Sequence, residues 1–272
     1  METNMEILRE IQLCQLDILK ELDRVCKIYD IKYWLAYGTF LGAVRHQGFI
    51  PWDDDLDVHM TMKDFRKFER ICKKELKKEY FLQTPNTQSN TKWLFYKIRK
   101  NNTLMLESGL TIGANEIHNG IWIDIFPMIS CAKTDNKKNK QILLLKKLQN
   151  LRYWHSNPND KERSLKTSIR ELIISFYEKI LWIRVSMLAS NKSSHYLIIE
   201  NEFYANKTEK HIARATIEKQ LFEKSAEYSF EGSLFMGILD YDAYLKQMYG
   251  IDYKVPKKFG QHVVDYSKVI LK

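Results

Sequence analysis

Apolar residues recur every three or four positions near the N-terminus, and this period predicts an amphipathic helix over residues 5–30. The apolar positions are Ile7, Ile11, Cys14, Ile18, Leu22, Val25 and Tyr29. They fall on one face, which suits packing against a core or binding to a partner. The same period returns at residues 63–80, where it predicts a second helix that covers a sheet.

Shorter apolar runs predict the strands of that sheet. Residues 33–36 form one buried run, which is followed closely by Gly38. Residues 121–126 form another run, which only Asp124 interrupts. The runs at 93–99 and 103–107 predict a hairpin.

A change of pattern sets off the second half of the chain. Residues 134–225 are rich in lysine, poor in glycine and apolar at helical spacing, which predicts a helical subdomain. Its most apolar stretch, residues 173–183, fits either a buried helix or contact with a membrane surface. We therefore expect an α+β fold in three parts. A core with the N-terminal helix spans 1–133, the inserted helical subdomain spans 134–225, and a segment at 226–272 folds back on the core.

Composition narrows the function classes. The chain has 272 residues and 32.5 kDa, with a net charge of +9, which favours an anionic partner such as a phosphorylated substrate, an acidic membrane or RNA. The four cysteines are scattered without a CxxC pair, which argues against structural zinc and favours a reducing cytoplasm. We expect neither a signal peptide nor a membrane span, because no long uncharged apolar run occurs.

The densest candidate chemistry lies between Gly38 and Asp57. On a strand, Asp55 and Asp57 share one face, and like charges so close favour a bound divalent cation such as Mg²⁺. The alternative is a solvated acidic turn. Gly38 precedes Thr39, which we expect to cap a short helix. The free amides of that helix start suit a phosphate, although the Gly-Thr dipeptide by itself favours a plain turn.

Two further strands add candidates. Asp124 stands alone in an apolar strand, which favours a third metal ligand, whereas a structural role would be to cap a turn or to pair with a lysine. Lys97 and Arg99 share a strand face, either as solvated edge charges or as a clamp for a diphosphate.

Several of these stretches together resemble the LicD family. They are Gly38-Thr39, Leu41-Gly42, Arg45-His46, residues 48–55 and Asp57. Later blocks at 97–107, 119–127 and 241–262 also resemble the family, although the double histidine often seen near its C-terminus is Gln261-His262 here.

The resemblance implies a nucleotidyltransferase-like mixed sheet with flanking helices, and a Mg²⁺-dependent (or Mn²⁺-dependent) phosphotransferase. It implies transfer of phosphocholine or a similar alcohol from a CDP-activated donor, CDP-choline first, to a glycan or lipid-linked glycan, with release of CMP. Asp55, Asp57 and Asp124 are expected to bind the metal, and Asp124 to accept the proton of the acceptor. The expected substrate contacts are Gly38, Thr39, Arg45, His46, Trp52, Lys97, Arg99 and His262.

Two other functions stay open at this point. One is a nucleotidyltransferase that leaves the nucleoside monophosphate on its acceptor. The other is a non-catalytic basic protein that binds RNA or anionic lipid, which the acidic cluster disfavours because carboxylates repel phosphate without a metal. We therefore expect no nucleic-acid partner, and a cytoplasmic enzyme with possible peripheral contact at the inner face of the membrane.

Overall fold

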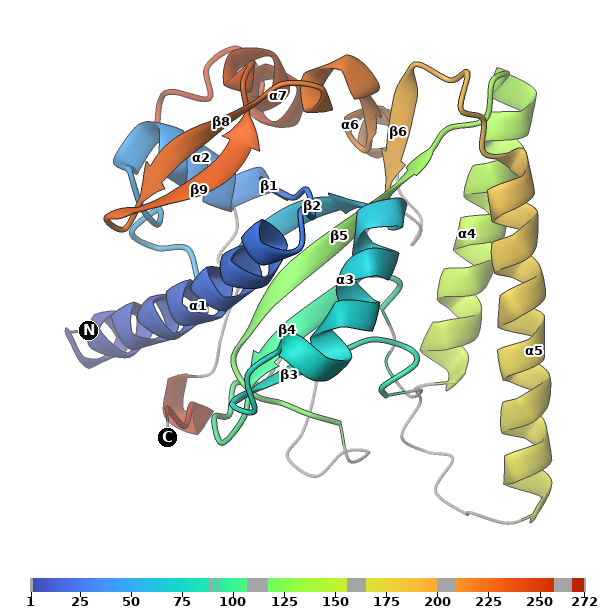
Figure 1. Cartoon of the computed structure of the whole chain (residues 1–272), viewed down its shortest axis with the longest axis horizontal. Helices are drawn as coiled ribbons and strands as arrows, with labels where there is room; N and C mark the ends of the chain where they lie inside the picture. The colour runs from blue at the N-terminus through green and yellow to red at the C-terminus, as the bar shows by residue number, and fades with distance from the viewer. Residues whose placement is uncertain are drawn as a thin grey trace.

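A computed structural model describes residues 2–88, 91, 93–106, 117–155, 165–199, 209–256 and 266–271. A seven-stranded mixed sheet runs through its centre, with helices beside it (Figure 1). The fold is therefore α+β, as predicted. The strands are β1 (Trp34–Leu35), β2 (Asp57–Thr61), β3 (Tyr80–Gln83), β4 (Tyr96–Lys100), β5 (Trp122–Ser130), β6 (His195–Ile198) and β7 (Thr216–Glu218).

The sheet is built around the long strand β5. Strand order is β1-β2-β5-β4-β3, with β2 and β5 parallel and the other pairs antiparallel. Strand β6 pairs with the far end of β5, and β7 pairs with β6. All but the last residue of β5 are buried, which places the core against this strand.

Helices α1 (Glu2–Ile28) and α3 (Met62–Glu75) cover one face of the sheet (Figure 1). Both predicted amphipathic helices are thus confirmed as packing helices. The ring of Phe65 on α3 stacks on Tyr96 of β4 with centroids 3.7 Å apart. Thr61 caps α3 because its side chain accepts a hydrogen bond from the amide of Asp64.

A long helical hairpin stands at one end of the sheet. It consists of α4 (Asp135–His155) and α5 (Leu165–Leu188), which lie side by side in Figure 1. These helices form the first part of the predicted subdomain. Its last part instead contains α6 (Glu209–Arg214) and η1 (Lys219–Phe222), together with β6 and β7 of the main sheet. The helical insertion therefore returns to the sheet before residue 225, and the division into three domains stays a prediction.

The C-terminal part packs on the motif region. Strands β8 (Ser225–Phe230) and β9 (Ser233–Ile238) form a hairpin that lies with α7 (Tyr241–Tyr249) beside α2 (Tyr37–His46) in Figure 1. Short η2 (Tyr266–Lys268) precedes a bridge between Ile270 and Leu104.

The predicted hairpin of residues 93–99 and 103–107 is wrong. Strand β4 pairs with β3 and β5, and within 103–106 only the bridge of Leu104 to Ile270 occurs. The reason is that β3 and β5 pair with the two edges of β4, so no edge of β4 is free to pair with the residues that follow it.

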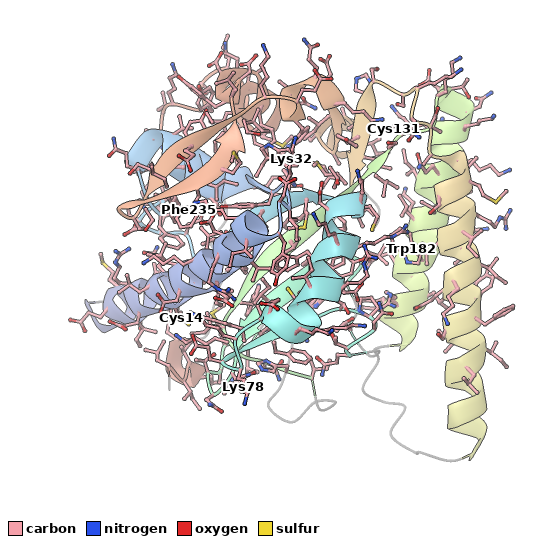
Figure 2. The ribbon with its side chains drawn as sticks, in the orientation of Figure 1. Cys14, Lys32, Lys78, Cys131, Trp182 and Phe235 are labelled. Carbon is pink, nitrogen blue, oxygen red and sulfur yellow. The ribbon has the colours of Figure 1, made fainter. Side chains whose placement is uncertain are left out.

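Two further observations concern the cysteines and the length of the helices. Cys14, Cys26, Cys72 and Cys131 are all free and buried, and Figure 2 shows Cys14 and Cys131 far apart. Within the part of the chain that the structure describes, no helix combines the length and apolar character needed to cross a bilayer.

Candidate active site

A row of charged side chains crosses the three central strands on the face opposite α1 and α3. Asp57 on β2 is in register with Asp124 on β5, and Asp124 is in register with Lys97 on β4. Side chains in register point to the same face of a sheet. The ammonium of Lys97 lies 2.6 Å from Oδ1 of Asp124, and the indole nitrogen of Trp122 donates to Oδ2 at 3.2 Å. Asp124 is therefore paired with a buried lysine, which is one of the structural alternatives to the favoured metal-ligand role.

Carboxylates gather beside this row. Burial, followed by the negative charges of Asp55 and Asp124, raises the pKa of Asp57 well above its usual range. Burial also raises the pKa of Asp53 to about 8, and the neighbouring Asp55 adds to this through its charge and a hydrogen bond. The solvated acidic turn is therefore wrong, because the cluster is largely removed from water.

The acidic loop is anchored by α1. Gln12 donates to the carbonyl of Asp53 at 2.9 Å, and Gln15 donates to the carbonyl of Asp54 at 2.8 Å. Sequence reasoning missed both glutamines and did not place Asp53 in the site. A signal was present, because Gln15 lies within the apolar stripe of the helix and is fully buried. A polar side chain in such a stripe needs a partner.

The start of α2 meets the acidic loop. Tyr37 has a left-handed backbone with φ of 42°, and its amide donates to the hydroxyl of Tyr244 at 3.1 Å. A Cβ on Gly38 would lie 2.5 Å from Oδ2 of Asp53, so glycine leaves room for that carboxylate at the helix start. Strained backbone of this kind is common at functional sites.

The prediction that Thr39 caps this helix is wrong. The cap position is Ala36, without a side-chain hydrogen bond, and Thr39 is the third residue of the helix, within its first turn. Its hydroxyl instead accepts a hydrogen bond from the amide of Asp57 at 2.8 Å. Thr39 thus ties α2 to the first residue of β2, which is a link that local sequence does not reveal.

Arg45 and two tyrosines of α7 border the cluster. Burial lowers the pKa of Arg45, and the charge of Asp53 acts in the opposite direction, as does Tyr249. Burial raises the pKa of Tyr249 well above its usual range, with further contributions from Tyr244 and from Asp57. Both tyrosines lie in the block at 241–262 that resembles the family, and neither is among the predicted site residues.

The remaining predicted contacts lie at the margin or outside. His46 accepts a weak hydrogen bond from Arg45 at 3.4 Å, and burial lowers its pKa. Trp52 is half-buried and packs against the core. His262 lies outside the described residues.

Arg99 has a different environment from Lys97. It is completely buried, donates to Oε1 of Gln83 at 2.7 Å and to the carbonyl of Gly120 at 2.9 Å, and lies over Trp122. The solvated-edge alternative is wrong for both cations, because β4 is an inner strand and Lys97 is also buried. Arg99 fixes the turn that leads into β5.

The donor chemistry of the cluster fits a hard divalent cation. Oδ1 of Asp57 is buried and has no hydrogen-bond partner among the described residues, and like charges surround it. Across that same part of the chain, no three acidic, histidine or cysteine side chains converge closely enough to hold a metal by themselves. A metal would therefore depend on Asp55 and Asp57 and take its other ligands from substrate or water.

Comparison with known proteins finds one family match that covers the central part of the chain. Residues 30–160 match the family described as LicD/FKTN/FKRP, nucleotidyltransferase domain. This segment is thus similar to a LicD-family domain. The matched segment holds α2, the acidic loop, β2, β4 and β5, so it includes every residue of the charged row.

Individual relatives match over shorter segments. The lipopolysaccharide cholinephosphotransferase LicD of Haemophilus influenzae is 44% identical over 77 residues, which is 28% of this chain and 29% of the relative. The ribitol 5-phosphate transferase FKRP of Homo sapiens is 37% identical over 62 residues, 21% of this chain and 12% of the relative. An uncharacterized protein of Rickettsia prowazekii is 49% identical over 54 residues, 20% of each. Each of these three matches therefore covers less than a third of the relative's own length.

Proposed function

We propose that this protein transfers a phosphorylated alcohol, with phosphocholine as the first candidate, from a CDP-activated donor to a hydroxyl of a glycan or lipid-linked glycan and releases CMP. The observation that carries the proposal is the buried row of Asp57, Asp124 and Lys97 beside the start of α2. Two relatives named as a cholinephosphotransferase and a ribitol 5-phosphate transferase support the class of reaction. The four free cysteines support the expected reducing compartment.

The carboxylates would bind the metal. Asp55 and Asp57 would hold Mg²⁺ or Mn²⁺. Burial, and then the charge of Asp55, raises the pKa of Asp57, and a bound cation would relieve this repulsion. Bound there, the cation would neutralise the charge of the donor diphosphate as CMP leaves. Thr39 fixes the amide of Asp57 and so holds β2 in position beside α2.

Other residues would act on the phosphates and the acceptor. The start of α2 at Gly38 and Thr39 favours an anion through its amides and dipole. Lys97 and Arg45 would neutralise phosphate oxygens, whereas the buried Arg99 would position the turn at Gly120. Asp124, oriented by Lys97 and Trp122, would accept the proton of the attacking hydroxyl.

The experiment measures CMP release from CDP-choline, CDP-glycerol and CDP-ribitol with Mg²⁺ and a glycan acceptor. We expect Asp57→Asn to lower turnover by on the order of a hundredfold, because a charge at the reacting centre is lost. Asp135→Asn is the matched control, since Asp135 is an exposed carboxylate at the start of α4. Equal turnover by both folded variants would reject the assignment.

A true nucleotidyltransferase is the second candidate, because the matched family description names that domain. The two functions differ in which half of the donor the acceptor keeps. Donor labelled in the alcohol and, separately, in the cytidine would distinguish them. We expect the alcohol label on the acceptor, and cytidine label there would favour the second candidate.

A further inference from the structure

The outer face of α5 is an unusually apolar surface. Five of its large apolar side chains are between 58% and 78% exposed: Leu172, Ile173, Phe176, Ile183 and Met187. The opposite side of the helix is buried, through residues that include Leu181 and Val185. Burial of the whole helix, the alternative to membrane contact in the sequence, therefore does not occur. We call these five residues the α5 stripe.

Helical geometry gives the α5 stripe two cationic borders. At 3.6 residues per turn its members share one side of the helix, and the exposed Lys179 and Arg184 fall on its two flanks. Among the described side chains of α5, no exposed acid balances them, and Glu171 of the same helix lies outside the described side chains. Of the described side chains of α4 and α5, only Asp135 and Glu178 are acidic, and Glu178 is buried against Arg152 at 2.7 Å.

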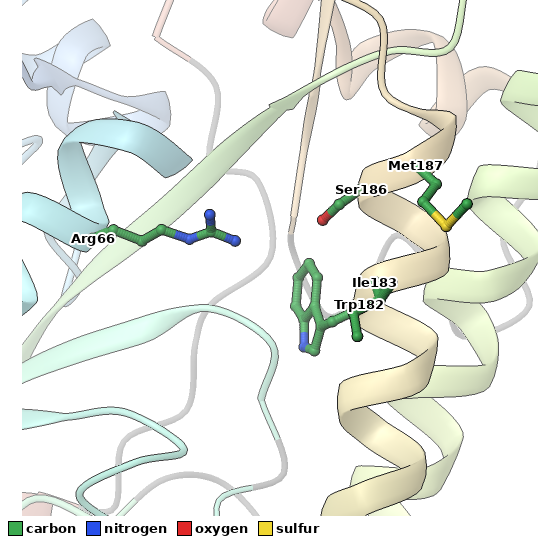
Figure 3. A pocket seen from close by; sticks show the side chains of 5 residues that line it. All are labelled: Arg66, Trp182, Ile183, Ser186 and Met187. Carbon is green, nitrogen blue, oxygen red and sulfur yellow. The ribbon is translucent and has the colours of Figure 1, made fainter.

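A groove continues the α5 stripe toward α3. It has a volume of about 430 Å³ and is lined by Arg66, Trp182, Ile183, Ser186 and Met187. Figure 3 shows Arg66 extending from α3 toward α5, where the ring of Trp182 lies on the facing side. Ile183 and Met187 belong to both surfaces. The groove thus joins an apolar floor to an exposed guanidinium and an indole, which suits an acyl chain below an anionic headgroup.

We propose that the α5 stripe, together with this groove, binds the surface of a membrane that contains anionic phospholipids. An apolar helix face with flanking cations binds such surfaces by burying apolar area and by attracting the lipid charge. A second copy is a poorer occupant, because a symmetric contact through the same face would bring the cationic borders together. The inference goes beyond the transfer reaction and does not depend on it.

Vesicle cosedimentation of the full chain tests this proposal. Vesicles of phosphatidylcholine with phosphatidylglycerol are compared with vesicles of phosphatidylcholine alone. We expect binding to the anionic vesicles to be at least tenfold tighter and to weaken as salt is added. The double variant Phe176→Ser, Met187→Ser should lose about tenfold or more in affinity, and Lys179→Glu, Arg184→Glu should lose the preference for anionic lipid.

Controls separate binding from folding and from self-association. Ile251→Ser removes an apolar side chain that is 84% exposed outside the α5 stripe, and it should bind like the parent. Thermal melts should be alike for all variants, because the substituted side chains are exposed. Absence of vesicle binding, or binding that neither double variant changes, would overturn the proposal. So would light scattering that shows a dimer of the parent and a monomer of the Phe176→Ser, Met187→Ser variant without vesicle binding.

Discussion

Lys97 and Asp124 face each other across β4 and β5, with the ammonium nitrogen 2.6 Å from Oδ1 and both side chains almost fully buried. Asp57 lies one strand further in the same register. Lys97 forms its ion pair with Asp124, so it compensates the negative charge of the neighbouring Asp57 only in part. This imbalance is the physical basis for expecting a divalent cation at Asp57.

The ion pair predicts the sign of a stability change at Asp124. Without metal, Asp124→Asn should lower the free energy of unfolding by about 3 kcal/mol, because the buried ammonium of Lys97 loses its counter-charge. Urea unfolding in EDTA measures this change. Asp17→Asn is a matched control, since the exposed Asp17 lies 3.5 Å from Lys100 and should contribute about 0.5 kcal/mol or less. Unchanged or increased stability of Asp124→Asn would show that repulsion among the carboxylates outweighs the pair.

The sequence was informative where chemistry is local. The two covering helices follow from apolar period, and the grouping of Asp55 with Asp57 follows from a short motif. The pairing of Asp124 with Lys97 could be stated only as an alternative, because register between β4 and β5 is a long-range property. For the same reason the role of Thr39 was misjudged, since its partner is the amide of Asp57, eighteen positions away in the chain.

Composition also concealed two features. Residues 195–198 and 216–218 lie in a lysine-rich region of helical character, yet they join the main sheet. Short strands take their stability from neighbours, so weak local preference is easily overridden. Asp53 stands in a run of three aspartates, and the sequence does not show which of them lies against Gly38.

We expect Arg99 to contribute mainly to the stability of the fold rather than to substrate binding. Arg99→Ala is expected to cost about 3 kcal/mol of unfolding free energy, because Gln83 and the carbonyl of Gly120 lose buried donors. Arg99→Lys should recover only part of this, since it lacks the planar fork. Urea unfolding measures both, with the exposed Arg70→Ala as control. Normal stability of Arg99→Ala with weakened donor binding in calorimetry would instead make Arg99 a direct phosphate contact.

The bond between Arg9 and Glu231 predicts a pH-dependent contribution to stability. Arg9 donates to Glu231 at 2.6 Å, Glu231 also accepts from the amide of Phe49, and the hydrogen bond from Arg9 holds the pKa of Glu231 below its usual value. This contribution is fully present above the ordinary pKa of about 4.3 and is lost as pH falls through the lowered value.

Glu231→Gln should therefore cost stability at pH 7 but not at low pH. We expect a loss of about 0.5 to 1 kcal/mol, since Arg9 is half exposed and solvent screens the pair. Urea unfolding at pH 7 and near pH 3 measures the difference between variant and parent. If the difference in unfolding free energy between Glu231→Gln and the parent is the same at both pH values, Glu231 stabilises the protein through packing rather than through its charge.

Gly38 and Gly42 predict a separation of activity from stability. A Cβ on Gly38 would meet the flexible end of Asp53 at 2.5 Å, whereas a Cβ on Gly42 would collide with the backbone carbonyl of Gly48. Because a carboxylate can rotate away and a carbonyl cannot, Gly38→Ala should cost less than about 1 kcal/mol and Gly42→Ala distinctly more.

Displacement of the Asp53 carboxylate in Gly38→Ala should nevertheless lower the activity of the site. Asp53 lies against Asp55, so its movement disturbs the acidic cluster, and Gly38→Ala should lower turnover at least tenfold in the folded protein, as small misplacements at reacting centres do. Chemical denaturation and CMP release, measured on the same preparations, give the two quantities. Full turnover by Gly38→Ala would mean that the position of Asp53 does not matter, and it would return Gly38 to the role of a plain turn residue.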